Sequence, residues 1–213
     1  WTPDRLWING GRGRFKEIDS LALRKIPSSS MGADFADINR DGYVDIFAVD
    51  MLSRSSEMRR RQTVARRAVP PRVGDLDSRV QTPQNTLLLN RGDGTFAEIA
   101  CLAGVEASDW SWSPMFLDVD LDGYDDLLIT SGHLRDIQDF DANNRILAQQ
   151  DGWRNSPMAV TNLQRAFTEA RRDHAKYYPP LSMPVVAFRN RGDLRFDEVT
   201  TRWGLDEPGG NHG

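Results

Sequence analysis

The chain repeats itself, and this internal repeat restricts the possible folds more than any other feature of its 213 residues. A shift of 81 positions superposes residues 6–18 on 87–99 and residues 30–45 on 111–126 without a gap. A shift of 100 positions adds a third copy of the first segment at 190–198. Self-similarity at such a spacing is typical of repeat architectures, in which each repeat is one structural unit.

Each repeat combines a glycine-rich turn with an aspartate-rich loop. The turn reads Asn-x-Gly-x-x-x-Phe, as in NRGDGTF at 90–96 and NRGDLRF at 190–196. Short apolar runs flank both the turn and the loop, and the glycines supply the positive φ of a tight hairpin. Each complete unit therefore predicts four short strands, and repeated four-stranded units indicate the blades of a β-propeller.

Both of these turns contain Arg-Gly-Asp, a tripeptide known as a ligand of cell-adhesion receptors. The first hairpin, NGGRGRF at 9–15, keeps the Asn, the Gly and the Phe but has Arg12 in place of the aspartate. Because only the three shared residues recur in every copy, we interpret the tripeptide as incidental to the turn.

Two acidic loops, DINRDGYVD at 37–45 and DVDLDGYDD at 118–126, share the ligand spacing of a calcium-binding loop. Oxygen-bearing side chains stand at positions 1, 3, 5 and 9, and glycine stands at position 6. They are not EF-hands, because position 12 is Ala48 or Ile129 instead of glutamate. With the backbone carbonyl of the tyrosine at position 7, the predicted metal ligands are Asp37, Asn39, Asp41, Tyr43 and Asp45 in the first loop, and Asp118, Asp120, Asp122, Tyr124 and Asp126 in the second.

The alternative for each loop is an acidic turn that binds nothing. Matched positions in two repeats favour a metal, because clustered carboxylates repel one another when no cation is present. Mg²⁺ suits such a loop less well than Ca²⁺, because it retains water and requires octahedral geometry. We therefore predict two Ca²⁺ sites.

The hairpin and the DxDxDG-like loop together resemble the FG-GAP or VCBS repeat, the blade of integrin α-subunit heads and of many bacterial secreted proteins. Three longer stretches are similar to bacterial proteins that resemble cartilage acidic protein and often carry an ASPIC/UnbV segment, although no such segment is visible here. These stretches are SMGADFADINRDGYVDIFAVDML, SWSPMFLDVDLDGYDDLLITSG and FRNRGDLRFDEVTTRWGLDEP. The resemblance implies a β-propeller, calcium in the blade loops and an extracytoplasmic location, whether secreted, periplasmic or at the cell surface.

The repeat register predicts an all-β fold with a helical insertion, a partial β-propeller with about two and a half four-stranded blades. One insertion, at 51–84, is rich in arginine, and a second, at 131–184, is expected to be helical. The predicted units are a half blade formed by an outer hairpin at 1–29, a blade at 30–110, a blade at 111–210, and the start of the next blade at 211–213.

Two helices are expected within the second insertion. The first spans roughly residues 139–151 and ends at Gly152. The second opens at Ser156-Pro157, because proline suits the first helical position, and it ends before Pro179.

The ends and the cysteine content of the chain suggest further expectations. It begins at Trp1 without a visible signal peptide, so we expect a mature or excised piece, a segment of a longer propeller. No apolar run reaches the roughly 18 residues of a membrane helix. The single cysteine, Cys101, excludes an internal disulfide and a zinc site built on several cysteines. Its apolar neighbours predict a small core residue.

Two further groups of residues allow more than one interpretation. The arginines of the first insertion could bind an anionic polysaccharide, nucleic acid or lipid headgroup. The lack of interleaved aromatic residues favours a solvated or partner-packed insertion instead. Trp110 and Trp112 could stack on sugars, but a packing role is favoured. The arginines are Arg54, Arg59, Arg60, Arg61, Arg66, Arg67 and Arg72.

Catalysis has little support in the sequence. The histidines are scattered, and Ser131-Gly132-His133 has no identifiable second triad member. Asp136, Asp139 and Asp141 could pair as an acid and a base, but they also suit the start of a helix. The chain is therefore predicted not to be an enzyme.

These features together predict a calcium-stabilised propeller segment of an exported bacterial protein, acting as a binding or assembly module. Its expected partners are a protein or a glycan and the remaining blades of a longer propeller, with no nucleic acid and no transmembrane segment. One alternative is an accessory or catalytic propeller of a secreted polysaccharide-degrading enzyme. Another is a structural subunit that docks into a larger complex through its insertions.

Overall fold

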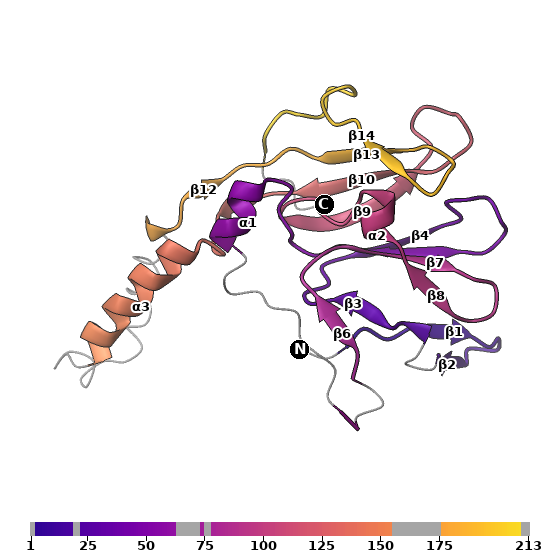
Figure 1. The fold of residues 1–213 in the computed structure, drawn as a ribbon, viewed down its shortest axis with the longest axis horizontal. Coiled ribbons are helices and arrows are strands. Elements are labelled where there is room, and N and C mark those ends of the chain that lie inside the picture. Colours follow the sequence, from indigo (N-terminus) through magenta and orange to yellow (C-terminus); the bar gives the residue numbers. More distant parts are fainter. Residues whose placement is uncertain (1–2, 19–21, 63–72, 75–77, 155–175, 210–213) are drawn as a thin grey trace.

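A computed structural model of the chain describes residues 3–18, 22–62, 73–74, 78–154 and 176–209, which form a mostly β structure (Figure 1). Within these residues the strands form several separate sheets, and none of the sheets closes into a barrel. This arrangement confirms the predicted all-β class and is consistent with a partial propeller.

The first four-stranded sheet, which we call blade 1, has its strands side by side in chain order, all antiparallel. Its third and fourth strands enclose the NRGDGTF turn. The second strand is buried along its whole length, and after its first residue, Asp45, its sequence is apolar instead of alternating. The strands are β4 (Ala33–Ala36), β5 (Asp45–Ala48), β7 (Thr86–Asn90) and β8 (Phe96–Glu98).

The second four-stranded sheet, blade 2, repeats this topology with the same antiparallel pairing. Its strands are β9 (Ser111–Leu117), β10 (Asp126–Ser131), β13 (Val186–Asn190) and β14 (Phe196–Glu198). In each blade an acidic loop joins the first two strands and a glycine turn joins the last two. The four-stranded unit predicted from the repeat is therefore confirmed.

Three smaller strand pairs accompany the blades. The hairpin of β1 (Trp7–Asn9) and β2 (Phe15–Glu17) is antiparallel and corresponds in the repeat to β7 and β8. The other pairs are β3 (Lys25–Pro27) with β6 (Val80–Thr82), which is parallel, and β11 (His133–Arg135) with β12 (Pro180–Leu181), which is antiparallel.

The largest apolar core lies between the two blades. Phe47 of blade 1 meets Phe116 of blade 2 edge to face, with ring centroids 6.2 Å apart. Burial of this kind stabilises by about 25 cal/mol per Å² of apolar surface. The buried members of this core are Ala36, Ile38, Phe47, Val49, Leu87, Ala100, Ala103, Val105, Leu127, Ile129, Val186, Phe188 and Phe196.

Helices occur mainly in the insertions. The helix predicted at 139–151 is confirmed as α3 (Phe140–Arg154), but its predicted end at Gly152 is wrong, because the helix continues past that residue. The Asp139 carboxylate caps this helix by accepting the Ala142 N–H at 2.8 Å. The second predicted helix lies outside the described residues. The sequence did not predict α1 (Ser56–Gln62) or α2 (Ala100–Ala103), which are too short to show a period.

The acidic loops and the insertions lie at opposite ends of the blades. Figure 1 shows the β4–β5 and β9–β10 loops at the right, with α1 and α3 packed together at the left. An antiparallel meander requires this separation, because its first and third connections lie at one end and its second at the other. None of the helices in the described part of the chain has the length and apolar character needed to span a membrane.

Candidate metal centres

The same hydrogen bonds, from backbone N–H groups to an aspartate side chain, shape the two acidic loops. In the first loop, the Asp37 carboxylate accepts the N–H groups of Asp41 at 3.0 Å and Gly42 at 2.8 Å. In the second, the Asp118 carboxylate accepts the equivalent N–H groups of Asp122 at 3.1 Å and Gly123 at 2.9 Å. The aspartate at position 1 thus folds each loop back on itself in the same way in both blades.

Position 4 of each loop contributes a feature that the sequence did not reveal. Arg40 and Leu121 have positive φ values of 61° and 59°, although neither is glycine. A left-handed conformation costs a residue with a Cβ about 1–2 kcal/mol. Because the same strain occurs in both loops, it belongs to the loop design and is offset by the hydrogen bonds around it.

The aspartate at position 9 is fully buried in both loops. The Asp45 carboxylate accepts the N–H groups of Ile38 and Asn90, and the Asp126 carboxylate accepts those of Val119 and Asn190. Neither carboxylate has an ion-pair partner among the residues that the structure describes.

This burial changes how readily the two carboxyl groups ionise. Burial raises the pKa of Asp45 above its ordinary value, and the neighbouring charges of Asp41 and Asp37 raise it further. Burial raises the pKa of Asp126 in the same way, with smaller contributions from Asp120 and Asp122. A raised pKa means that each site favours a neutral group or a compensating cation.

The second loop brings three carboxylates to one point. One oxygen from each of Asp118, Asp120 and Asp126 lies within 4.8 Å of the others, and in the described part of the chain only this group meets that geometry. In the first loop, the Asn39 amide donates to the Asp41 carboxylate at 2.9 Å. Predicted ligands thus lie together on both loops, with the tighter carboxylate cluster in the second.

Arg189 lies beside the second loop, and the sequence did not predict this position. Arg189 in β13 forms ion pairs with Asp120 and with Asp122. The Arg189 side chain holds the pKa of Asp120 below its ordinary value, chiefly through their hydrogen bond. The shift of 100 places Leu89 at the equivalent position of blade 1, so the repeat pattern gives no sign of a cation here.

The acidic loop and the glycine turn of each blade are physically joined. A Cβ built on Gly92 would lie 2.8 Å from Cζ of Tyr43, and one on Gly192 would lie 2.9 Å from Cζ of Tyr124. The tyrosine at position 7 therefore packs directly on the backbone of the turn. This contact requires glycine in addition to the positive φ of 74° and 73° at the two positions.

The recurring asparagine of the hairpin makes a second link between turn and loop. The Asn90 side chain donates to the Val44 carbonyl and accepts the Gly92 N–H. The Asn190 side chain donates to the carbonyls of Asp125 and Ile38, so it also reaches the acidic loop of blade 1. The asparagine recurs in all three hairpins of the sequence, but this recurrence did not predict that its side chain binds carbonyl groups of the acidic loops.

The all-oxygen donor set fits Ca²⁺, which takes about 6–8 oxygen ligands. Asp118, Asp120 and Asp126 converge, and within the described part of the chain the buried Asp126 carboxylate forms no ion pair. Arg189 already places positive charge beside this group, as a cation at the site would. Zinc would be expected to use histidine or cysteine ligands, and neither is part of this cluster.

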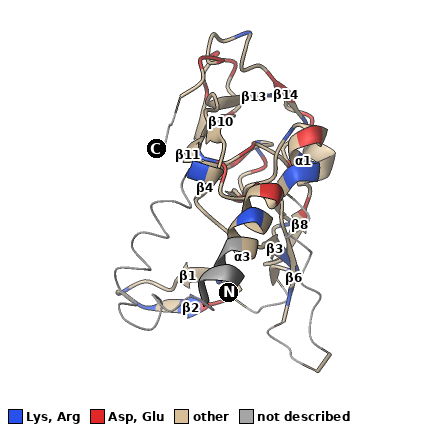
Figure 2. Cartoon of the chain, turned by 90° about the vertical axis from the view of Figure 1, so that its left-hand side faces the viewer, with Lys and Arg blue, Asp and Glu red and all other residues tan. Residues whose placement is uncertain are grey.

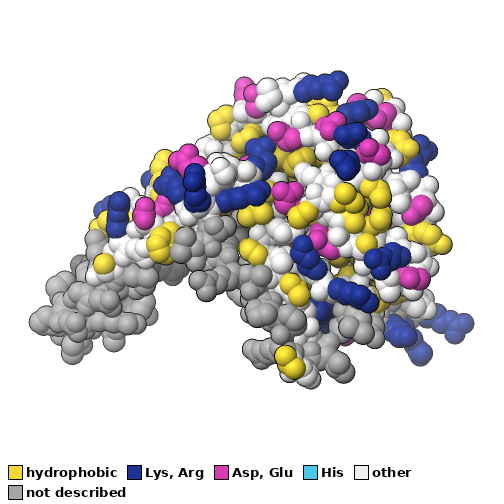
Figure 3. All heavy atoms as spheres, in the orientation of Figure 1, with side chains coloured by type: hydrophobic (Ala, Val, Ile, Leu, Met, Phe, Trp, Pro, Cys, Tyr) yellow, Lys and Arg dark blue, Asp and Glu magenta, His cyan; other side chains and the backbone are white. Residues whose placement is uncertain are grey.

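The arginines of the first insertion that the structure describes are largely paired within the chain. Arg54 binds the buried Asp109 carboxylate at 2.7 Å, and Arg61 binds Asp139 at 2.5 Å. Figure 2 shows basic and acidic residues side by side on α1 and α3, and Figure 3 shows mixed charges over one face of the molecule. Arg66, Arg67 and Arg72 lie outside the described residues. The described geometry supports a packed insertion.

The weak catalytic candidates are used as structural elements. Asp139 is the cap of α3, and the buried Asp136 accepts a hydrogen bond from Gln62 of α1 at 2.9 Å. Trp110 is buried, and the centroid of the His133 ring lies 5.0 Å from that of Trp110 and 6.2 Å from that of Trp112. The other two histidines lie outside the described residues.

Cys101 is exposed, so its predicted core position is wrong. It lies on α2, whose buried residues are Ala100 and Ala103. The apolar neighbours in sequence did not reveal this, because successive residues of a helix point in different directions.

The comparison with known families gives one match. The model of a family described as FG-GAP-like repeat matches residues 2–48 and 73–129. These two stretches contain the first hairpin, both acidic loops and the second hairpin. A search of the curated proteins finds no match.

Proposed function

The chain carries FG-GAP-like repeats, and from this premise we propose that it is a calcium-binding interaction module within a larger, exported β-propeller. Repeats of this family suggest a propeller domain that mediates interactions. The observation that supports the calcium assignment is the convergence of Asp118, Asp120 and Asp126, the last of which is buried and forms no ion pair with any described residue.

Calcium would act structurally in this proposal. Asp118 belongs to the loop that follows β9, and Asp126 is the first residue of β10. A cation shared by them would tie the first two strands of blade 2 together and offset the burial of Asp126. Asp37, Asn39, Asp41 and Asp45 would do the same for blade 1, and the backbone carbonyls of Tyr43 and Tyr124 are the proposed ligands at position 7.

A module of this kind suits an extracytoplasmic location and no catalytic role. Sites in extracellular modules bind calcium with dissociation constants of about 10⁻⁴–10⁻³ M, which match the calcium level outside cells. The best-placed acid and base candidates are engaged in capping and in helix–helix contacts. We propose a protein or glycan as the partner, without naming it, and the remaining blades of the propeller beside it.

Calorimetric titration of the chain with Ca²⁺, paired with melting curves in calcium and in EDTA, tests the proposal. We expect saturable binding in the range given above and a higher melting temperature in calcium. Asp118→Asn combined with Asp120→Asn should remove one site. The control is Asp125→Asn, which removes one negative charge from the same loop outside the converging group. Absence of binding heat and of any thermal shift up to about 10 mM Ca²⁺ would refute the assignment.

A further inference from the structure

The repeat makes the two blades directly comparable, face by face. Six residues of blade 2 lie on the face that packs against blade 1. The shifts of 81 and 100 identify six equivalents in blade 1, on the opposite face from the Phe47 core. The blade 2 set is Phe116, Leu127, Ile129, Val186, Phe188 and Phe196, and the blade 1 set is Phe35, Ile46, Ala48, Thr86, Leu88 and Phe96.

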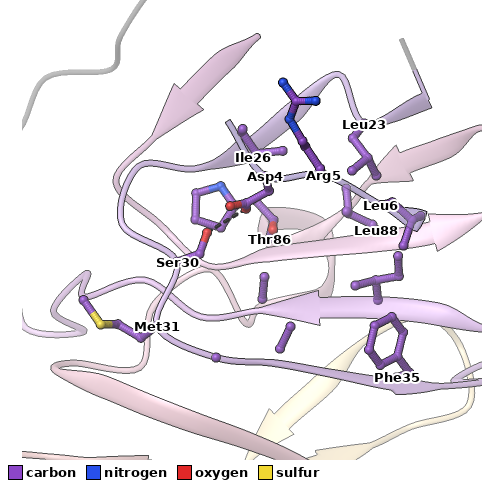
Figure 4. A pocket seen from close by; sticks show the side chains of 15 residues that line it. Asp4, Arg5, Leu6, Leu23, Ile26, Ser30, Met31, Phe35, Thr86 and Leu88 are labelled. Atoms are coloured by element: carbon purple, nitrogen blue, oxygen red, sulfur yellow. Dashed lines mark hydrogen bonds between the residues drawn. The ribbon is translucent and has the colours of Figure 1, made fainter. Parts of the chain in front are cut away.

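The equivalent face of blade 1 is covered over most of its area but leaves Phe35 exposed beside a cavity. Leu6, Leu23 and Ile26 pack against its outer part, next to Leu88 and Phe96. Its inner part opens into a cavity of about 340 Å³, drawn in Figure 4, with Ile46, Ala48 and Phe35 on its wall. Phe35 is 54% exposed, whereas its equivalent, Phe116, packs against Phe47.

A buried polar atom marks this cavity as incomplete. The Thr86 side chain is fully buried and lines the cavity, but its hydroxyl has no hydrogen-bond partner among the residues that the structure describes. An unsatisfied buried hydroxyl costs about 1–3 kcal/mol, so such groups are normally paired. The equivalent residue of the covered blade 2 face is Val186, which needs no partner.

The covered face of blade 2 indicates which elements would cover the equivalent face of blade 1. On blade 2 the inner part of the face is covered by the inner strands of blade 1, through Ala36 of β4 and Phe47 of β5. In front of blade 1 the described elements are the outer hairpin β1–β2 and strand β3, and β1 pairs with β2 alone among the described strands. Its equivalent, β7, pairs on both sides, with β5 and β8.

We infer that the open face of blade 1 is the docking surface for the inner β-hairpin of a further blade of the same polypeptide. The second strand of that hairpin pairs with the free edge of β1. Its apolar face covers Phe35 and fills the cavity beside Ile46 and Ala48. The inference deepens the proposed place in a larger propeller, but it does not depend on calcium.

The test uses the inner hairpin that this chain already contains as the probe. A copy of residues 31–50 is joined through a flexible linker to the N-terminal end of the full chain. We expect the melting temperature to rise by at least about 4 °C and the fluorescence of a bound apolar dye to fall, in calcium and in EDTA alike. Stabilisation without any calcium effect would refute the calcium proposal alone.

Two matched variants of blade 1 and blade 2 keep the test specific. Phe35→Asp alters an exposed residue of the open face and should abolish the gain from the joined hairpin. Met115→Asp is the control, because it is similarly exposed at 48%, lies outside the cavity, and its repeat equivalent is already Asp34. No gain with the joined hairpin, or an equal gain in Phe35→Asp, overturns the inference. Concentration-dependent dimerisation of the unmodified chain that Phe35→Asp removes would assign the face to a second copy instead, and would also overturn it.

Discussion

Replacing Arg189 with leucine should strengthen calcium binding at the β9–β10 loop by about three- to tenfold. Arg189 forms ion pairs with Asp120 and Asp122, two of the proposed ligands. Calcium must either displace the Arg189 guanidinium or bind beside its positive charge, and both weaken calcium binding. Leucine is the residue that blade 1 has at this position, so the change is compatible with the fold.

The magnitude follows from the exposure of the three side chains. About a third of each is exposed to solvent, so each pair contributes modestly and is weakened by salt. Losing two such pairs should change the calcium affinity by about three- to tenfold. In the metal-free protein the same pairs are stabilising, so the variant should melt about 2–4 °C lower in EDTA.

Calorimetric calcium titration and melting in EDTA measure the two opposite effects. Arg191→Leu is the matched control, because Arg191 lies in the adjacent turn and pairs with Asp193 and Asp197 instead of the loop. It should leave both the affinity and its ratio between the two sites nearly unchanged. An unchanged or weaker calcium affinity in Arg189→Leu would show that the guanidinium does not compete at the site.

Two further predictions concern the link between loop and turn, and a third concerns the buried Asp126 carboxyl group. Gly192→Ala should destabilise the chain by about 2–3 kcal/mol, because the new Cβ meets the Tyr124 ring. The control Gly94→Ala has open space around it and should cost only about 1 kcal/mol. Urea unfolding measures both losses of stability, and equal losses would contradict the contact. Asn190→Ala should cost about 2–3 kcal/mol in the same assay through two lost hydrogen bonds to backbone carbonyls, and a loss below about 0.5 kcal/mol would show that the bridge contributes little. Burial raises the folded-state pKa of Asp126, so protonation of this carboxyl group favours the folded, metal-free chain. Lowering the pH from 7 toward 3.8 in EDTA should therefore stabilise the wild type relative to Asp126→Asn. A stability difference that does not depend on pH would contradict the raised pKa.

Much of the fold could be predicted because the repeat fixes both the strand order and the turn chemistry. The strands around the two acidic loops and the glycine turns occur where the apolar runs predicted them. The short helix α1 could not be predicted in this way, because its seven residues give no period and it is held by contacts with α3. The end of α3 depended on Gly152, and one glycine costs a helix only about 1 kcal/mol.

The candidate site could be predicted in its ligand spacing but not in its surroundings. Position in the loop is enough to select Asp118, Asp120 and Asp126, because a tight loop brings alternate side chains together. Arg189 comes from a strand far along the chain and departs from the repeat, so no local pattern predicts it. The burial of Asp126 likewise depends on the packing of neighbouring strands, which spacing alone does not determine.

The separation of the two ends of each blade has a consequence for protein engineering. The connections from β5 to β7 and from β10 to β13 leave the blades at the end away from the acidic loops (Figure 1). Loop-closure entropy grows slowly with length, by only about 0.6 kcal/mol for each doubling. Foreign segments grafted into either connection would therefore be displayed on one rim of the molecule, with the loop–turn link of each blade serving as an untouched anchor on the other.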